Sequence, residues 1–102
     1  MEHLNKIELC GIVGSVRFTT VCNKRMATFS LATNYMYKDS QGCPVIETTW
    51  HQVKAWEGDG LDALSKGSKV HVLGRLHQMR YTDADGVEHS SMIVIANKVE
   101  IL

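Results

Sequence analysis

The sequence predicts an all-β domain, a closed barrel of five strands with one short helix between the third and fourth. Alternating apolar residues recur through most of the chain, turn signals separate these stretches, and a single stretch shows helical spacing. The 102 residues can bury one core, and no internal repeat or linker divides them. We therefore expect one domain, 1–102.

The first half of the chain predicts three strands. Residues 6–21 alternate in polarity around Gly11 and Gly14, and glycines inside a strand mark the bulges or bends that a closed barrel needs. A turn at 22–25 leads into a second strand, 26–37. A polar tip then leads into a third strand, 45–56.

The second half predicts the helix and two more strands. Within 57–66, Leu61 and Leu64 have i, i+3 spacing, and Gly67 stands where a helix C-cap is expected. Strands are predicted over 68–81 and 87–102, on either side of a turn signal. Three strands, a short helix and two strands is the element order of an OB-fold, a five-stranded Greek-key barrel.

Charge and composition restrict the classes of protein. Eleven Lys and Arg balance eleven Asp and Glu, so no overall positive field attracts a polyanion, although a local basic strip remains possible. The sequence contains no membrane span and no signal peptide, which predicts a cytoplasmic protein. Three cysteines make an odd count, and we expect Cys10, Cys22 and Cys43 to be small core residues rather than disulfide partners.

The sequence lacks the motifs of common enzymes. It has no H-E-x-x-H, G-x-S-x-G or P-loop pattern, its five histidines are scattered, and its carboxylates fall mostly near turns. We therefore expect no catalytic site, no cofactor and no metal. A zinc site assembled from distant cysteine and histidine side chains is the alternative left open.

The aromatic residues are the most informative. Alternation places Trp50, Lys54 and Trp56 on one face of the third strand, so two rings flank a lysine. Tyr37 ends the second strand, and Tyr81 ends the fourth. Rings exposed beside cations stack bases of any sequence, whereas rings in a core or a subunit interface are the alternative.

Several segments resemble the bacterial single-stranded DNA-binding proteins. The resemblance runs from Asn5-Lys6-Ile7 to the end of the chain, and its most specific parts are Phe29-Ser30-Leu31-Ala32-Thr33, Thr49-Trp50-His51, Lys66-Gly67-Ser68-Lys69-Val70 and the segment from Arg80 to Gly86. It implies an OB-fold that assembles as a homotetramer, with a dimer second, and wraps single-stranded DNA.

The resemblance also implies roles for particular residues. The four places where the family has base-stacking aromatics hold Tyr37, Trp50, Trp56 and Tyr81. His51 matches a histidine at the family's subunit contact. Together with the strand pattern, the resemblance predicts six phosphate-contacting cations: Lys6, Lys38, Lys54, Lys66, Arg75 and Arg80.

Three departures from the family pattern change the expectations. His77 and Met79 occupy positions that are commonly arginine, which predicts weaker and less salt-sensitive binding. The loop after Gly14 is shorter. The sequence stops at Ile101-Leu102, without the flexible linker and acidic tip that recruit replication and repair enzymes in the family, so recruitment of such partners is left open.

The predicted function is sequence-independent binding of single-stranded DNA. Such a protein coats exposed strands during replication, recombination and repair, and associates with the nucleoid. The alternative is a primosome-type OB-fold adaptor, a dimer that bridges a replication helicase and DNA. Four subunits favour the first function and two the second. Stacking alone does not distinguish DNA from RNA.

Overall fold

The computed structural model describes residues 2–56 and 61–102, and it confirms the predicted five-stranded barrel. Each strand boundary lies within two residues of its predicted position. The elements are β1 (Ile7–Val21), β2 (Lys24–Lys38), β3 (Pro44–Trp56), the 3₁₀ turn η1 (Leu61–Ala63), β4 (Lys69–Thr82) and β5 (Glu88–Ile101).

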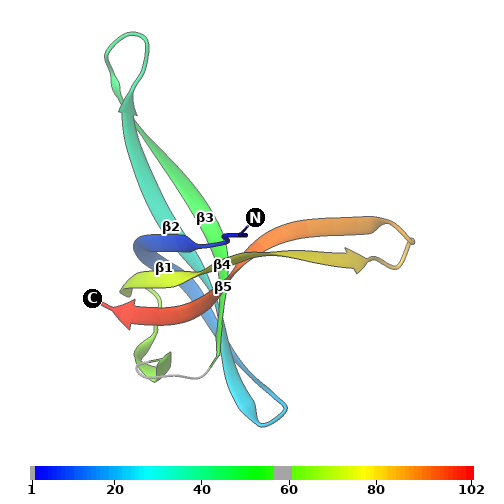
Figure 1. Cartoon of the computed structure of the whole chain (residues 1–102). Coiled ribbons are helices and arrows are strands. Elements are labelled where there is room, and N and C mark those ends of the chain that lie inside the picture. The colour runs from blue at the N-terminus through cyan, green and yellow to red at the C-terminus, as the bar shows by residue number, and fades with distance from the viewer. Residues whose placement is uncertain (1, 57–60) are drawn as a thin grey trace.

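The barrel closes in the order β1-β2-β3-β5-β4. The long β1 strand serves two neighbours, because its first half pairs with β4 and its second half with β2. All neighbouring strands are antiparallel except β3 and β5, which pair in parallel over three residues. This short parallel ladder completes the ring (Figure 1).

Of the two glycines predicted to mark bulges or bends in β1, Gly14 lies at a bulge and Gly11 lies at a close approach of two strands. The β1–β2 register shifts between Val13 and Ser15, which places a bulge at Gly14. A Cβ atom on Gly11 would lie 2.1 Å from the carbonyl oxygen of Ala32, so only glycine allows this close approach. The bulge reverses the alternation of β1: Val13 faces the core before it, whereas Arg17 is exposed after it.

The core is aliphatic, with one large ring. Its fully buried side chains are Val13, Phe29, Leu31, Val53, Val70 and Val72. Leu61 and Leu64, predicted as an apolar pair, join this cluster from η1 and the residue that follows it. They connect the segment after β3 to the barrel interior.

A single 3₁₀ turn takes the place of the predicted short helix. The amide of Leu64 donates to the carbonyl of Leu61 at 3.1 Å, so an i, i+3 apolar pair is satisfied by one turn. Residues 57–60, at the start of the segment predicted to hold the helix, lie outside the described residues. Gly67, predicted as a helix C-cap, has the left-handed φ of +90° expected of such a residue, but in the described residues it follows a 3₁₀ turn rather than an α-helix. Within 2–56 and 61–102, no helix has the length and apolarity needed to cross a bilayer.

The expectation that the cysteines fill the core is wrong, because all three are exposed. Cys10 follows the exposed Glu8 in alternation, on the outer face of β1. Cys22 is in the β1–β2 turn with φ +52°, and Cys43 is in the β2–β3 loop. Position in the strand pattern therefore outweighs the general tendency of free cysteine to be buried.

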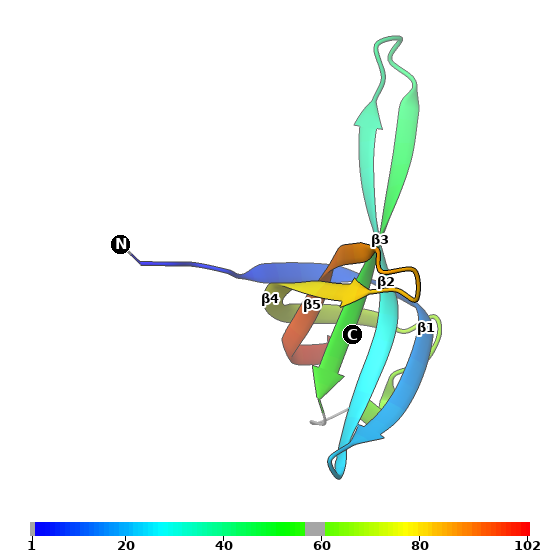
Figure 2. The ribbon, with the colours of Figure 1, turned by 90° about the vertical axis from the view of Figure 1, so that its right-hand side faces the viewer.

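Two hairpins extend beyond the barrel in different directions (Figures 1 and 2). We call the outer part of the β2–β3 hairpin the β2–β3 arm and that of the β4–β5 hairpin the β4–β5 arm. The β2–β3 ladder is regular from Met26–Trp56 to Lys38–Pro44. The β4–β5 ladder reaches Thr82–Glu88, with one register shift at Leu73–Gly74.

Candidate nucleic-acid interface

Both tryptophans lie on the outer surface of the barrel. Trp50 is 61% exposed and Trp56 is 45% exposed, on the face of β3 opposite to the buried Val53 and Ala55. A Cβ on Gly14 would come within 2.5 Å of the Trp50 ring, so this ring lies across the glycine of β1. These positions exclude the core interpretation of the tryptophans.

Two adjoining hollows lie on this same surface. The smaller, about 220 Å³, contains Ser30 and Ser15 beside the Trp50 position. The larger, about 350 Å³, extends to Met79 and Ser91 of the β4–β5 hairpin. Both are lined by Arg17, Thr28 and Gln52. We call the two hollows together the groove; it leads from Trp50 toward the β4–β5 arm.

Two cationic side chains line the groove. Lys54 is half-buried, and its Nζ lies 3.9 Å from the sulfur of Met79. Arg17 contributes to both hollows. Among residues 2–56 and 61–102, neither cation forms an ion pair with a carboxylate. Both are therefore available to an incoming anion.

Tyr81 continues the groove face along the β4–β5 arm. Alternation places it on the same face of β4 as Met79, and it pairs across the ladder with His89. The rings of Tyr81 and His89 are stacked, with centroids 5.0 Å apart and planes 18° apart. One face of the tyrosine ring is therefore covered by the imidazole.

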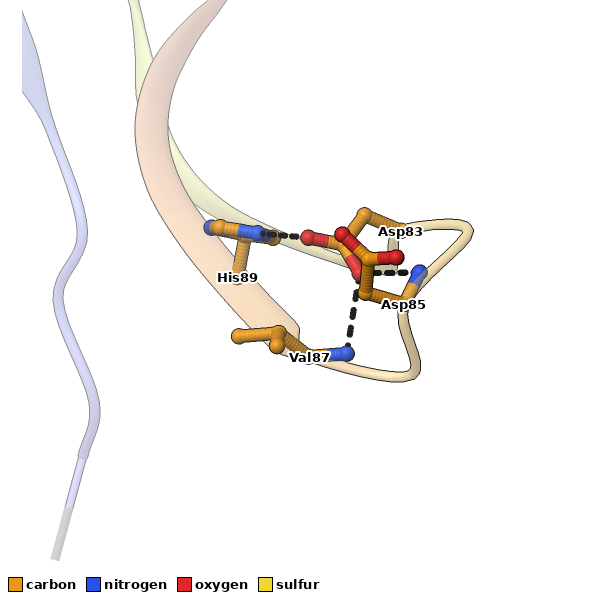
Figure 3. A network of polar contacts seen from close by, with 4 residues as sticks. All are labelled: Asp83, Asp85, Val87 and His89. Carbon is orange, nitrogen blue, oxygen red and sulfur yellow. Dashed lines mark hydrogen bonds and ion pairs between the residues drawn. The ribbon is translucent and has the colours of Figure 1, made fainter.

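Asp83 holds this imidazole in place (Figure 3). Its Oδ2 lies 2.7 Å from Nε2 of His89, while its Oδ1 accepts the amides of Asp85 and Val87, each at 2.9 Å. The hydrogen bond from His89, followed by the one from Val87, holds the pKa of the Asp83 carboxyl below its usual value. The carboxylate is thus ionised at neutral pH.

Tyr37 lies on the other face of the β2–β3 arm. Because the β2–β3 ladder is uninterrupted, Tyr37 shares its face with Leu31, whereas Trp50 shares the opposite face with its partner Ala32. Tyr37 stacks on Tyr35 at 6.1 Å, and Tyr35 is 69% exposed. Tyr35 was not among the predicted site residues.

The six predicted phosphate-contacting cations are dispersed. Lys54 lines the groove. Lys6 lies across from Arg75, because Asn5 hydrogen-bonds to the backbone of Leu76 and Ile7 pairs with Gly74. The other three lie elsewhere on the surface: Lys38 at the end of β2, Lys66 after η1, and Arg80 on the face of β4 opposite to Tyr81.

Arg17 is the groove cation that sequence reasoning missed. The side chain of Arg17 faces outward because the bulge at Gly14 reverses the alternation of β1. The signal that could have found it is the bulge itself, since Val16 and Phe18 then both face the core.

His51, the predicted subunit-contact residue, is half-buried on the face of β3 opposite to Trp50. Its Nε2 lies 2.9 Å from Oγ1 of Thr33. This contact orients the ring within one chain, and the role at a subunit interface stays a prediction. Within the described residues, no three His, Cys, Asp or Glu side chains gather as metal ligands.

Comparison with known proteins places the chain in a family. The model of the single-strand binding protein family matches residues 4–102. A single-stranded DNA-binding protein of Xanthomonas campestris is 39% identical over 97% of this chain and 60% of that protein. The mitochondrial single-stranded DNA-binding protein of Bos taurus is 31% identical over 97% of this chain and 75% of that protein.

Solved structures agree on the fold. A Plasmodium falciparum SSB complex with ssDNA superposes with a TM-score of 0.83 and 30% identity, covering 100% of this chain and 96% of that one. A Thermus aquaticus single-stranded DNA-binding protein, at 23% identity and a TM-score of 0.81, shares the fold over 97% of this chain and 50% of that one. The chain spans about 60% of the length of the Xanthomonas relative. It belongs to the single-strand binding protein family.

Proposed function

We propose that this chain binds single-stranded DNA independently of sequence. The observation that carries the proposal is the groove: two cations, Arg17 and Lys54, lie between the exposed ring of Trp50 and the Tyr81 platform, and neither forms an ion pair within residues 2–56 and 61–102. The names of its relatives and the DNA-bound Plasmodium structure support the same function.

Base stacking and phosphate contacts both contribute to binding. Each base stacked on an aromatic ring contributes about 1–3 kcal/mol, and every base has a face to stack on, so Trp50, Trp56, Tyr81 and Tyr37 accept any sequence. Arg17 and Lys54 neutralise phosphates and release counterions, which makes affinity depend on salt. With zero formal net charge, attraction of the strand is local to these cations.

The path beyond the groove uses the remaining predicted cations. Lys6 and Arg75 lie together, and Lys38, Lys66 and Arg80 provide separate contacts for a longer strand. Met79 is uncharged where family members commonly have arginine, and in this chain it contacts Lys54. We therefore expect weaker salt dependence than in members that carry arginine at that position.

We infer that the biological role is coating of exposed strands in replication, recombination and repair, in the nucleoid of the cytoplasm and without catalysis. The assembly proposed is a homotetramer, with His51 at a subunit contact and a dimer second. Replication and repair proteins are candidate partners. The primosome-type adaptor remains the competing function, with two subunits.

Titration of intrinsic tryptophan fluorescence with oligo-dT, at low and high salt, tests the proposal. Trp50 and Trp56 are the two tryptophans of the sequence. We expect quenching that saturates at a fixed nucleotide-to-protein ratio. The variants Trp50→Phe and Trp56→Phe should each retain part of this quenching. An unchanged signal at low salt contradicts the proposal.

Sedimentation of the free protein tests the assembly separately. A tetramer supports the coating function. A dimer together with unchanged tryptophan fluorescence favours the adaptor function.

A further inference from the structure

The two arms end in the same loop. In 39–43 and in 83–87, one carboxylate oxygen of the leading aspartate accepts the amides two and four residues later. The fourth residue of each loop is a glycine with φ near +80°. Each arm also has a tyrosine two residues before the aspartate, Tyr37 and Tyr81. The loops therefore present two tyrosines in matched surroundings.

The arms differ at the residue across the ladder from the tyrosine. Tyr37 pairs with Val45, and Tyr81 pairs with His89. His89 reaches the second oxygen of Asp83 at 2.7 Å and covers Tyr81 with its ring at 5.0 Å. Valine offers neither contact. We call His89 with its contacts to Asp83 and Tyr81 the clamp. The β4–β5 arm has this clamp, whereas the β2–β3 arm has Val45 in its place.

Two neighbours, the Asp83 carboxylate and the Tyr81 ring, contact His89. Because Asp83 is a carboxylate, Nε2 of His89 donates the hydrogen bond between them. An imidazolium gains from this carboxylate and from the π-face of Tyr81. Nδ1 of His89 has no partner within the described part of the chain, and the side chain is 42% exposed. A phosphate oxygen can therefore reach it.

Four other charged or titratable groups lie near this clamp: Arg80, Glu88, Asp85 and His77. Arg80 and Glu88 neighbour Tyr81 and His89 in sequence and so project from the opposite face of the arm. Asp85 contributes its backbone amide to Asp83. His77 shares the face of Tyr81 but lies beyond the Met79–Ser91 pair.

We propose that His89, anchored by Asp83, is a positioning residue for Tyr81, and that the chain binds single-stranded DNA more tightly when His89 is protonated. The proposal rests on the proposed function. His89 covers one face of the tyrosine ring, which leaves the other face for a base. Its Nδ1–H, present only in the imidazolium, donates to a phosphate, so strand binding takes up a proton.

The test is the dissociation constant for labelled oligo-dT between pH 6 and pH 8, measured on the full chain and three variants. His89→Val copies the β2–β3 arm, and His89→Phe keeps a ring but cannot be charged. The control, His71→Phe, removes a histidine that also pairs with a carboxylate, Glu8 at 2.6 Å, but has no ring stacked on it within residues 2–56 and 61–102. Thermal unfolding of each variant checks the fold.

We expect His89→Val to weaken binding about three- to tenfold at pH 6, because Tyr81 loses both its backing ring and its cation. His89→Phe should bind like the original chain at pH 8 and lose the gain at pH 6, about threefold. His71→Phe should keep the whole pH profile. NMR of the original chain should show the imidazole signals of His89 shifting when oligo-dT binds.

Identical pH profiles for the original chain and His89→Phe overturn the proposal, as does unchanged affinity in a folded His89→Val variant. Failure of the proposed function looks different, because then oligo-dT quenches tryptophan fluorescence in none of the proteins, the original chain included.

Discussion

The β2–β3 and β4–β5 arms have the same loop chemistry but hold their tyrosines differently. Tyr81 is stacked on His89, which hydrogen-bonds to Asp83, and it lies on the groove face. Tyr37 has Val45 across the ladder, stacks on the neighbouring Tyr35, and lies on the face opposite to Trp50. A shared turn therefore fixes the backbone of an arm, while the cross-strand residue determines how its aromatic ring is held.

This difference affects the energy of binding. A ring already fixed in its bound orientation loses less conformational entropy when a base stacks on it. Tyr81 is stacked on His89, which Asp83 holds in turn, and it adjoins the groove, so it should engage any strand that enters there. Because Tyr37 lies on the face opposite to Trp50, we expect it to be reached by a strand that passes around the β2–β3 arm. The two arms should thus respond to strands of different length.

The largest expected effect is the loss of Tyr81. Tyr81→Ala should weaken binding of a short oligo-dT of about 8 nucleotides roughly 10- to 100-fold, because one stacked base is worth about 1–3 kcal/mol. Tyr37→Ala should leave the short strand unaffected and weaken only longer ones. Dissociation constants for a series of oligo-dT lengths measure both. Equal losses on the shortest strand would contradict the division between the arms.

The lysines of the two regions should also differ in the length of strand that they bind. Lys54→Gln should lower the slope of log K against log salt by about 0.7 for short and long strands alike, since one phosphate contact disappears. Lys38→Gln, at the end of the β2–β3 arm, should lower this slope only for long strands. Lys98→Gln, an exposed position of β5, serves as the charge-matched control. A slope that Lys54→Gln leaves unchanged argues against the groove as the phosphate path.

Transfer of the clamp to the other arm should give a smaller effect. In Val45→His, the new imidazole faces the free oxygen of Asp39 and the ring of Tyr37, as His89 does in the β4–β5 arm. We expect long strands to bind about threefold more tightly at pH 6, because one exposed cation–π contact contributes about that much to the affinity. Short strands should bind as before. If long strands gain nothing while NMR shows the imidazole stacked, the clamp does not act by positioning.

Acid should loosen the loop 83–87 of the β4–β5 arm. Of the changes considered, this one should have the smallest effect on DNA binding. The pKa of Asp83 is lowered, so its hydrogen bonds stabilise the folded chain above the ordinary value of 3.8 and this stabilisation is lost as pH falls through the lower folded-state value. The amide signals of Asp85 and Val87 should shift over that range. In Asp83→Asn they should not titrate in this way; if they do, another carboxyl is responsible.

Most of the barrel could be predicted from the sequence, because period-two alternation and Gly or Asp turn signals are local. Gly14 was expected at a bend and lies at a bulge, and Leu61 and Leu64 were expected as an apolar pair and join the core. The length of η1 was less accessible, since i, i+3 spacing fits both a 3₁₀ turn and an α-helix. The cysteines were misplaced by relying on residue type rather than on strand position.

The site was harder to predict, because it depends on which face each residue occupies. Trp50, Trp56 and Lys54 were found together since they alternate on a single strand. Arg17 was missed because a bulge changes the direction of its side chain. The role of His89 depends on register between two strands, which brings it to Tyr81, and no local pattern encodes that contact.

Chemical-shift mapping of the full chain with a short oligo-dT tests the difference between the arms most directly. We predict that the indole signals of Trp50 and the signals of Lys54, Tyr81 and His89 shift together at low saturation, while those of Tyr37 stay unchanged until a longer strand is used. Shifts at Tyr37 that match those at Tyr81 with the shortest strand would contradict the account.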